Sequence, residues 1–406
     1  MSVEERFVRF CGELGNFCER VTGTSLIDAY FGPDELVPSR QRKDSMPEAL
    51  LRELDVIRDL ISDQISERIR QDFMLSDIKS LRTTLLWLSG HEIPYVDLVE
   101  GLFHVEPRAF AESDVEAARQ RVEDAFSTFP GEDTQDRVTR FRTVGEIIGP
   151  QAKEFIEVEL QRESVEIGRM FKTKIYDVIG ESVTDNGISY EAVRGKPWGA
   201  YNWYKGNYRS VNQFNIDRPI NRNTVNAAVY HEYEHHVSLL WREKAYLERG
   251  WTDLSVVLLH TGRSIIAEGT ADTAADFLGV GRGTREGTAV RAMTDLFRIL
   301  SINAAMMMNQ EEVPFDEAVE YAIERSFSPR ESLEGALGFM TPKTPSGSPN
   351  FFSPYVFAYF IGRNEFVYPA FAKAKERNML SKFYRTAYLN PYVGHSATWR
   401  DAFDWL

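Results

Sequence analysis

The sequence predicts a mainly helical fold that contains a cleft and a small antiparallel β-sheet. Apolar residues recur at helical spacing through most of the chain, for example over residues 4–21 and 47–88. Over residues 186–219 the period changes to an alternation of aromatic or aliphatic with polar residues, which is typical of short strands. The helical pattern then resumes around the segment His231-Glu232-Tyr233-Glu234-His235. These observations place the predicted sheet directly before the helix that carries this segment.

Residues 1–150 are predicted to form an N-terminal helical region that makes one wall of the cleft. The first helix covers about residues 4–21, and a loop rich in helix-breaking residues follows over 28–36. Apolar positions interleaved with charge over residues 47–88 predict long antiparallel helices. Two shorter helices are expected near residues 95–103 and 113–129.

Residues 151–406 are predicted to form the second wall, which bears the functional residues. A long amphipathic helix is expected over about residues 151–179, followed by three short strands at about 188–216. The helix with the two histidines should then span about residues 224–248. The remaining segments are a glycine-rich loop between helices at 279–287, a linker at 341–349 and core helices that include the aromatic run 351–371.

Composition excludes several classes of partner. The formal net charge of −14 argues against nucleic acid and anionic membrane surfaces. No apolar run reaches the ~18 residues that a membrane-spanning helix needs, and the acidic N-terminus favours a cytoplasmic location. Cys11 and Cys18 would lie ~10.5 Å apart along their helix, which is too far for a disulfide. The oligomeric state is not predicted.

The strongest functional signal is the pattern HExxH at residues 231–235. Two histidines four residues apart on a helix are separated by only ~6 Å along the axis and ~40° around it, so His231 and His235 can bind one metal ion. Glu232 lies beside them and can reach a water molecule at the metal without being a ligand. This pattern predicts one catalytic Zn²⁺ per chain.

A third metal ligand is expected downstream of this helix. Glu268 and Asp272 lie one turn apart in a segment of small and apolar residues, where a carboxylate is costly unless it meets a positive charge. We expect Glu268 to bind the zinc. Asp272 is placed to accept the second N–H group of a ligating histidine and so to set its tautomer.

The combination of these motifs resembles a known family. The HExxH segment followed by Glu268-Gly-Thr-Ala-Asp272 is similar to the gluzincin metallopeptidases, and the helical surroundings resemble their oligopeptidase and carboxypeptidase Taq-like branch. The segment Phe352-Ser-Pro-Tyr355 through Tyr359 resembles the aromatic helix that places a tyrosine near the metal in that branch. Asp28-Ala-Tyr-Phe-Gly-Pro also resembles helical HExxH proteins related to it. The resemblance implies a large helical metallopeptidase-like fold and hydrolysis of peptides.

The chemistry assigns further residues to roles. Glu232 is predicted to act as the general base, and Tyr355 is the first choice for stabilising the oxyanion, with Tyr359 and His395 as alternatives. Residues 209–216 are predicted to present the sheet edge to which an extended peptide substrate adds, with Asn212 contributing a backbone donor.

Several alternatives stay open at this point. The substrate is expected to be a peptide, but a zinc hydrolase of another amide or an ester fits the same residues, as does a non-catalytic binding or scaffold protein stabilised by a metal. The basic residues that could meet a substrate carboxylate are Lys205, Arg209, Arg218, Arg263 and Arg363. The histidines expected to be structural are His91, His104 and His260, whereas His236 is expected to pack in the core or to support a metal ligand without binding the metal itself.

Overall fold

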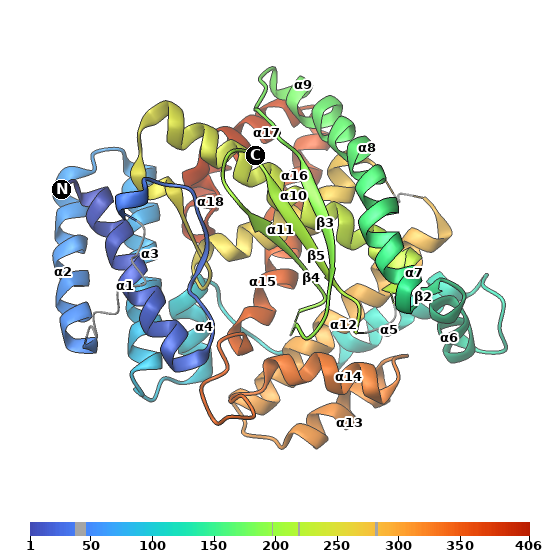
Figure 1. The fold of residues 1–406 in the computed structure, drawn as a ribbon. Helices are drawn as coiled ribbons and strands as arrows, with labels where there is room; N and C mark the ends of the chain where they lie inside the picture. Colours follow the sequence, from blue (N-terminus) through green and yellow to red (C-terminus); the bar gives the residue numbers. More distant parts are fainter. Residues whose placement is uncertain (37–45, 197, 218–219, 281–282) are drawn as a thin grey trace.

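The computed structural model describes residues 1–406 except 37–45, 197, 218–219 and 281–282, and it confirms the predicted mainly helical fold (Figure 1). The helices of the first 150 residues agree closely with prediction, except that the helix Thr134–Val144 was not expected. They are α1 (Val3–Thr22), α2 (Pro47–Gln64), α3 (Arg68–Leu88), α4 (Tyr95–Phe103), α5 (Glu112–Phe126), α6 (Thr134–Val144) and the start of α7 (Gly149–Glu154).

The predicted helix at 151–179 is also present, as a run in which α7, α8 (Gln161–Phe171) and α9 (Asp177–Ile179) are joined by π-helical turns at Phe155–Leu160 and Lys172–Tyr176. The helices that follow are α10 (Arg222–Arg249), α11 (Gly262–Leu278), α12 (Arg285–Asn309), α13 (Phe315–Arg325), α14 (Arg330–Leu337), α15 (Val356–Ile361), α16 (Tyr368–Glu376), α17 (Leu380–Leu389) and α18 (Ser396–Ala402).

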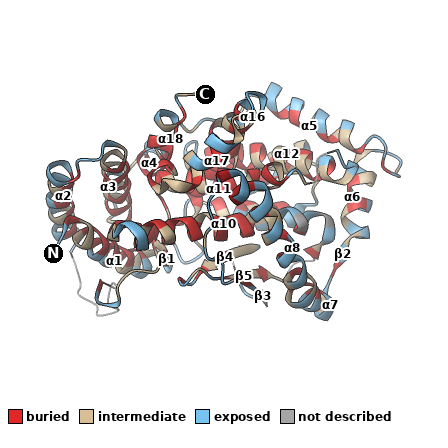
Figure 2. Cartoon of the chain, turned by 90° about the horizontal axis from the view of Figure 1, so that it is seen from above, coloured by how far each residue is buried: buried red, intermediate tan, exposed pale blue. Residues whose placement is uncertain are grey.

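Of the first 150 residues, α1–α3 and α5–α6 pack in two groups at opposite ends of the molecule, and α4 packs in the central core (Figures 1 and 2). Helices α1, α2 and α3 build one hydrophobic core together with the end of α10 and Tyr392. Helices α5 and α6 build another core against α12. The predicted N-terminal wall is therefore not one body, because α5 and α6 bury their apolar faces on the second half of the chain.

The strands form three small sheets. The first pairs β1 (Ile27–Tyr30) with β7 (Val256–Leu258), and the second pairs β2 (Glu146–Ile147) with β6 (Ile220–Asn221), both antiparallel. The third has the order β3-β5-β4, with bounds β3 (Ile188–Val193), β4 (Ala200–Tyr204) and β5 (Ser210–Asn215). Its β4–β5 pair is antiparallel as predicted, but β3 and β5 run parallel, because the chain crosses from β3 to β4 before β5 enters between them.

The predicted substrate edge at residues 209–216 is wrong, because β5 is the central strand of this sheet. Asn212 is completely buried, and its side-chain carbonyl accepts a hydrogen bond from the Asn202 amide at 2.5 Å. The free edge belongs to β4. Since Asn215 N–H donates to Gly199 O and the bonds of an antiparallel pair alternate, the backbone N–H and C=O groups of Ala200 and Asn202 point away from β5.

Helices α10 and α11 lie at the centre of the fold, and both are buried along most of their length (Figure 2). Helix α11 also crosses the π-helical turn Gly362–Val367, and the two backbones lie in close contact. A Cβ atom on Gly362 would lie 1.9 Å from the carbonyl oxygen of Ile265, and one on Gly269 would lie 2.5 Å from the carbonyl of Gly362. These two glycines therefore set how deeply α11 sits against its neighbours.

Cys11 and Cys18 are buried and free, as predicted. Within the described part of the chain, no helix combines the length and the apolar character that crossing a membrane requires.

We predict that Gly362→Ala destabilises the protein by about 1–3 kcal/mol or more, because the added methyl group must push two backbones apart. Thermal unfolding followed by circular dichroism measures the effect. Gly338→Ala is the matched control, since a Cβ atom at Gly338 meets nothing within 4 Å and its φ is −57°. Equal melting temperatures for the two variants would contradict the proposed role of Gly362.

Candidate metal centre

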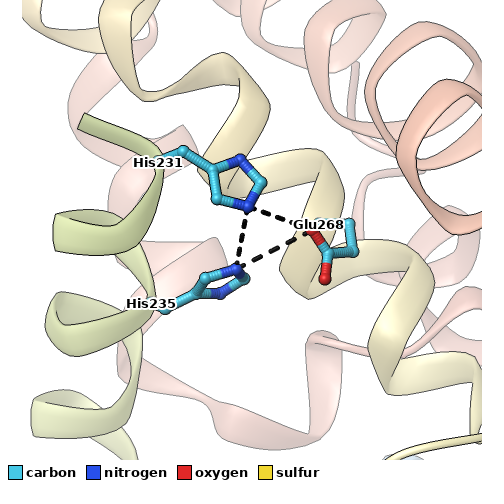
Figure 3. A group of neighbouring side chains, drawn as sticks. All are labelled: His231, His235 and Glu268. Carbon is cyan, nitrogen blue, oxygen red and sulfur yellow. Dashed lines mark hydrogen bonds and ion pairs between the residues drawn. The ribbon is translucent and has the colours of Figure 1, made fainter. Parts of the chain in front are cut away.

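The two histidines of the HExxH segment converge as predicted. His231 and His235 lie on the same face of α10, and their Nε2 atoms are 3.1 Å apart (Figure 3). Burial lowers the pKa of His235 to about 4, so this imidazole is neutral at pH 7 and its Nε2 lone pair is available to a metal.

Glu268 of α11 completes the group from the opposite side (Figure 3). Its Oε2 atom lies 3.2 Å from Nε2 of His231 and 3.8 Å from Nε2 of His235. A zinc ion with tetrahedral ligands at ~2.1 Å places those ligand atoms ~3.4 Å apart. The three measured separations lie on either side of this value, so the spacing of the donor atoms suits zinc.

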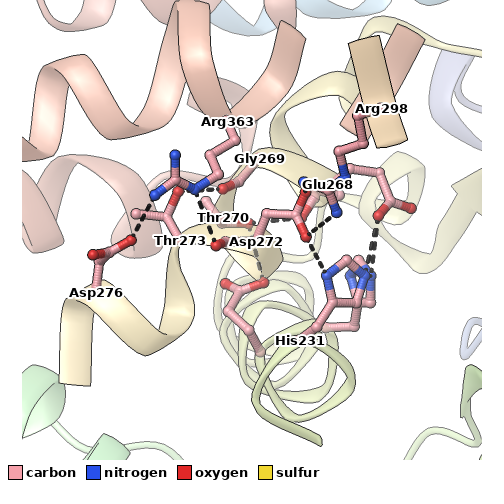
Figure 4. A network of polar contacts seen from close by, with 12 residues as sticks. His231, Glu268, Gly269, Thr270, Asp272, Thr273, Asp276, Arg298 and Arg363 are labelled. Atoms are coloured by element: carbon pink, nitrogen blue, oxygen red, sulfur yellow. Dashed lines mark hydrogen bonds and ion pairs between the residues drawn. The ribbon is translucent and has the colours of Figure 1, made fainter. Parts of the chain in front are cut away.

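Asp272 accepts from the first histidine, as predicted. Its Oδ1 atom is 2.9 Å from Nδ1 of His231, and Arg298 of α12 holds the same carboxylate with Nη2 at 2.8 Å from Oδ1 and Nη1 at 2.5 Å from Oδ2 (Figure 4). Burial by itself would raise the pKa of Asp272, but the Arg298 charge and the His231 hydrogen bond hold that pKa well below its usual range. Asp272 is therefore ionised, and it keeps the His231 proton on Nδ1.

This tautomer decides what the centre can bind. With Nδ1–H donating to Asp272, a neutral His231 turns a lone pair toward Oε2 of Glu268, which is buried and has no hydrogen-bond donor among the described residues. Without a cation the two groups can share only a proton, and accordingly the pKa of His231 is raised by Asp272 and Glu268 although burial opposes this. A buried acceptor without a donor costs ~1–3 kcal/mol. One zinc ion would satisfy all three donor atoms, so the residues fit the predicted metal.

The donor atoms open onto a cavity of about 100 Å³, which has room for several water molecules. Glu232 lines it, and no described residue donates a hydrogen bond to its carboxylate. Burial raises the pKa of Glu232 to about 7. The other lining residues are Asp28, Trp198, Ala200, Tyr201, Asn202, His231, His235, Leu239, Leu259, Arg263, Ser264, Ala267, Glu268, Phe339, Phe352, Tyr355 and Tyr359.

Both predicted tyrosines reach this cavity, but in different ways. The hydroxyl of Tyr355 donates to Oε1 of Glu268 at 2.8 Å, so it orients the ligand carboxylate. The hydroxyl of Tyr359 has no hydrogen-bond partner among the described residues. Its ring lies 6.4 Å from that of His231 and below the guanidinium of Arg298, 5.5 Å from the ring centroid.

The predicted alternative role of His395 is wrong. His395 is completely buried outside the cavity, where its Nδ1 atom accepts a hydrogen bond from Ala397 N–H and caps α18. Its ring packs edge-on against Phe73 at 5.1 Å. The sequence could not reveal this, because a histidine as a helix cap has no pattern that separates it from one in a surface loop.

The other histidines are structural, as expected. His236 is hydrogen-bonded to Ser210 at 2.8 Å and Asp185 at 3.1 Å, which ties α10 to the sheet. His260 stacks on the ring of Phe351 at 3.8 Å. His91 contacts the backbone carbonyl of Leu86 near the end of α3, and His104 contacts that of Ser76 in the middle of α3.

Three residues near the centre have roles that were not predicted from the sequence. Asp28 in β1 accepts a hydrogen bond from the Tyr201 hydroxyl and is the cavity-lining residue supplied by residues 1–150. Arg298 supports Asp272 from α12. Glu234 of α10 is completely buried and accepts hydrogen bonds from Thr270 of α11 and Tyr388 of α17, each at 3.0 Å. The second glutamate of the HExxH segment could have suggested that last role, but its partners are distant in sequence.

Of the basic residues considered for a substrate carboxylate, Arg263 is the one that lines the cavity. Lys205 and Arg209 are exposed. Arg363 is buried and donates to Asp276 at 2.9 Å (Figure 4). Arg218 lies outside the described residues.

Comparison with solved structures supports the fold. The chain is similar to the crystal structure of the putative lipoprotein from Colwellia psychrerythraea, with a TM-score of 0.52 and 13% sequence identity. The match covers 90% of this chain and 64% of that chain, so this chain spans less than two thirds of its length. No family model matches the chain, and no curated protein matches it either. At this identity the likeness concerns the fold alone.

We predict that Asp272→Asn weakens zinc binding by roughly 10- to 100-fold, because the charge is lost and the one oxygen of the amide must serve both Arg298 and the His231 N–H group that sets the tautomer. Competition with a chromogenic chelator measures the affinity. Asp276→Asn is the matched control, since Asp276 lies one turn further along α11 and pairs with Arg363. Unchanged zinc affinity in the Asp272 variant would show that the carboxylate does not support the ligand.

Proposed function

We propose that this protein is a zinc-dependent hydrolase, specifically a metallopeptidase of gluzincin type. The observation that carries the proposal is the position of Glu232, whose carboxylate has no partner among the described residues and lines the same cavity as His231, His235 and Glu268. This matches the predicted arrangement of a general base beside a metal with three protein ligands.

The same observation favours catalysis over a structural metal. Structural zinc sites are closed by four protein ligands, whereas catalytic sites keep one position for water or substrate. Here three donors from two helices face a cavity, and a fourth His, Cys, Asp or Glu ligand is not found with them in the described part of the chain. A scaffold protein would also have no need for an unpaired, buried glutamate, which is costly to maintain.

The proposed roles follow from the surroundings of each residue. When bound, zinc would lower the pKa of a coordinated water and polarise the substrate carbonyl. Glu232 accepts the proton of the attacking water and then delivers it to the leaving amine. Its raised pKa makes it a good proton acceptor near neutral pH. Asp272 and Tyr355 keep His231 and Glu268 in place.

Tyr359 is the better candidate for stabilising the oxyanion. Tyr355 was the first choice from the sequence, but its hydroxyl proton is already donated to Glu268. The hydroxyl of Tyr359 lacks such a partner among the described residues, and its ring is held between His231 and Arg298. A donor that is free before the substrate binds can be directed at the developing negative charge.

A peptide is the proposed substrate because the cavity also borders the free edge of β4. The outward backbone groups of Ala200 and Asn202 are those to which an extended chain would pair. A non-peptide amide or an ester would use the same water and base without needing this edge. Parallel assays on peptides, simple anilides and esters distinguish the two, and hydrolysis of the small substrates alone would favour the second.

We predict that Glu232→Gln keeps about one zinc per chain and lowers kcat by several orders of magnitude, because the proton acceptor is lost. Glu234→Gln is the matched control: it is two residues away and also buried, but its partners Thr270 and Tyr388 are hydroxyls, one of which can donate to the amide oxygen while the other accepts from the amide N–H. Metal analysis and a peptide-cleavage assay test both variants. In the wild type, cleavage should fall as the pH decreases through the pKa of Glu232. Full activity in the Glu232→Gln variant would show that Glu232 is not the general base.

We further predict that Tyr359→Phe lowers kcat by roughly 10- to 1000-fold with little change in KM, as expected for a donor used in the transition state. Tyr355→Phe should instead weaken zinc binding, because Glu268 loses its orienting hydrogen bond. Kinetics at saturating zinc and zinc affinity, measured side by side, separate the two roles. The reverse pattern would restore Tyr355 as the oxyanion donor.

A further inference from the structure

Among the described residues that line the cavity, Arg263 is the one cationic side chain apart from the histidines. It lies in the first turn of α11, and the cavity-facing residues Arg263, Ser264, Ala267 and Glu268 follow one another at helical spacing. Its guanidinium makes no hydrogen bond or ion pair with any described residue. A partly buried arginine without a carboxylate partner is unusual, since its five donors are normally satisfied.

The surroundings do not neutralise this charge. Asp28 also lines the cavity, and burial raises its pKa while the Arg263 charge opposes this rise, as it does for the pKa of the buried Glu234, but Arg263 forms no ion pair with either residue. Asp28 is instead engaged by the hydroxyl of Tyr201. The remaining acids of the cavity, Glu232 and Glu268, are assigned to the base and to the metal. The guanidinium is therefore left available to a ligand.

We propose that Arg263 binds the α-carboxylate at the C-terminus of the substrate, which makes this protein an exopeptidase that acts at the carboxyl end of peptides. The inference rests on the proposed hydrolytic function and narrows its substrate class. Arginine matches a carboxylate with two parallel N–H donors, a geometry that an internal peptide bond does not offer.

The distance between Arg263 and the metal ligand limits where the cleaved bond lies. Five helical residues separate Arg263 from Glu268, which corresponds to ~7.5 Å along α11. An extended peptide covers this length with about two residues. A carboxylate held by Arg263 therefore places the bond attacked at the metal centre one or two residues from the chain end.

The wall of the cavity indicates which terminal side chain it accepts. Phe339 and Phe352 stack at 4.7 Å, and Trp198 and Tyr201 lie 5.6 Å apart. Such aromatic surfaces favour an aromatic or large aliphatic residue. An N-acetylated tripeptide that ends in phenylalanine is therefore a suitable probe, as the free acid and as the C-terminal amide.

Binding of this pair to zinc-loaded Glu232→Gln, measured by calorimetry, tests the proposal without requiring turnover. The acid should bind on the order of 10- to 100-fold more tightly than the amide. Adding Arg263→Met should reduce the affinity for the acid to that for the amide, and Arg263→Lys should keep part of the difference. Lys205→Met is the control, because this exposed cation lies outside the cavity lining and should leave the preference intact. Repeating the titration on metal-free protein removes any contribution from direct binding of the carboxylate to zinc.

The possible outcomes distinguish a failure of the Arg263 proposal from a failure of the proposed hydrolytic function. Equal affinity for acid and amide, or no binding of either, would overturn the role of Arg263 even if the wild type cleaves peptides. A preference for the acid that persists in the Arg263→Met variant would also overturn the role of Arg263. A preference that depends on Arg263, in a protein that cleaves no peptide, would keep the carboxylate site and remove the hydrolase. Wild-type digestion of a longer peptide should release one or two C-terminal residues, and internal cleavage of the amidated form at an equal rate would also contradict the proposal.

Discussion

The structure around the candidate centre depends on the burial of two carboxylates of α11 against the imidazoles of α10. The side chains of Glu268 and Asp272 are only 8% and 7% exposed, and an unpaired ion at such a position costs several kcal/mol. Asp272 is balanced by Arg298 and by the His231 N–H group. Glu268 is balanced only in part, by one hydroxyl and by two nitrogens that carry lone pairs when neutral. This incomplete balance is what makes the site suited to a cation.

The rest of the fold holds these two helices at a fixed separation. The close backbone contact of Gly269 and Gly362 lets the π-helical turn approach α11 from behind, and Arg363 from that turn secures Asp276 and the carbonyl of Asp272 (Figure 4). On the other side, His236 joins α10 to the sheet. Metal ligands must be held to within about 0.5 Å of productive geometry, and a buried pair of helices braced on both sides meets this demand better than loops do.

The proposed chemistry uses residues from distant parts of the chain. The ligands and the base come from α10 and α11, the candidate oxyanion donor from α15, and Asp28 from a short strand near the N-terminus. Glu232 and Glu268 illustrate how surroundings assign roles to similar groups. Burial dominates for Glu232 and raises its pKa, whereas the neighbouring histidines outweigh burial for Glu268 and lower its pKa. The first is suited to accept a proton, and the second to remain an anionic ligand.

The sequence by itself determined the helical class, the positions of most helices and the cluster of His231, His235, Glu268 and Asp272. The helices and the pairs His231/His235 and Glu268/Asp272 follow from spacing along a helix, where residues four apart share a face whatever the rest of the chain does. That the two pairs meet was expected because a carboxylate among small and apolar residues is costly unless it meets a positive charge. Tertiary structure alone decided that β5 is central and β4 the edge, because strand order depends on partners that a local pattern does not specify. It likewise decided that His395 caps a helix, that the hydroxyl of Tyr359 is free to act as a donor while that of Tyr355 is not, and that Arg263 faces the cavity. Each of those roles is set by contacts between segments far apart in the sequence, and a contact of that kind leaves no periodic trace in either segment.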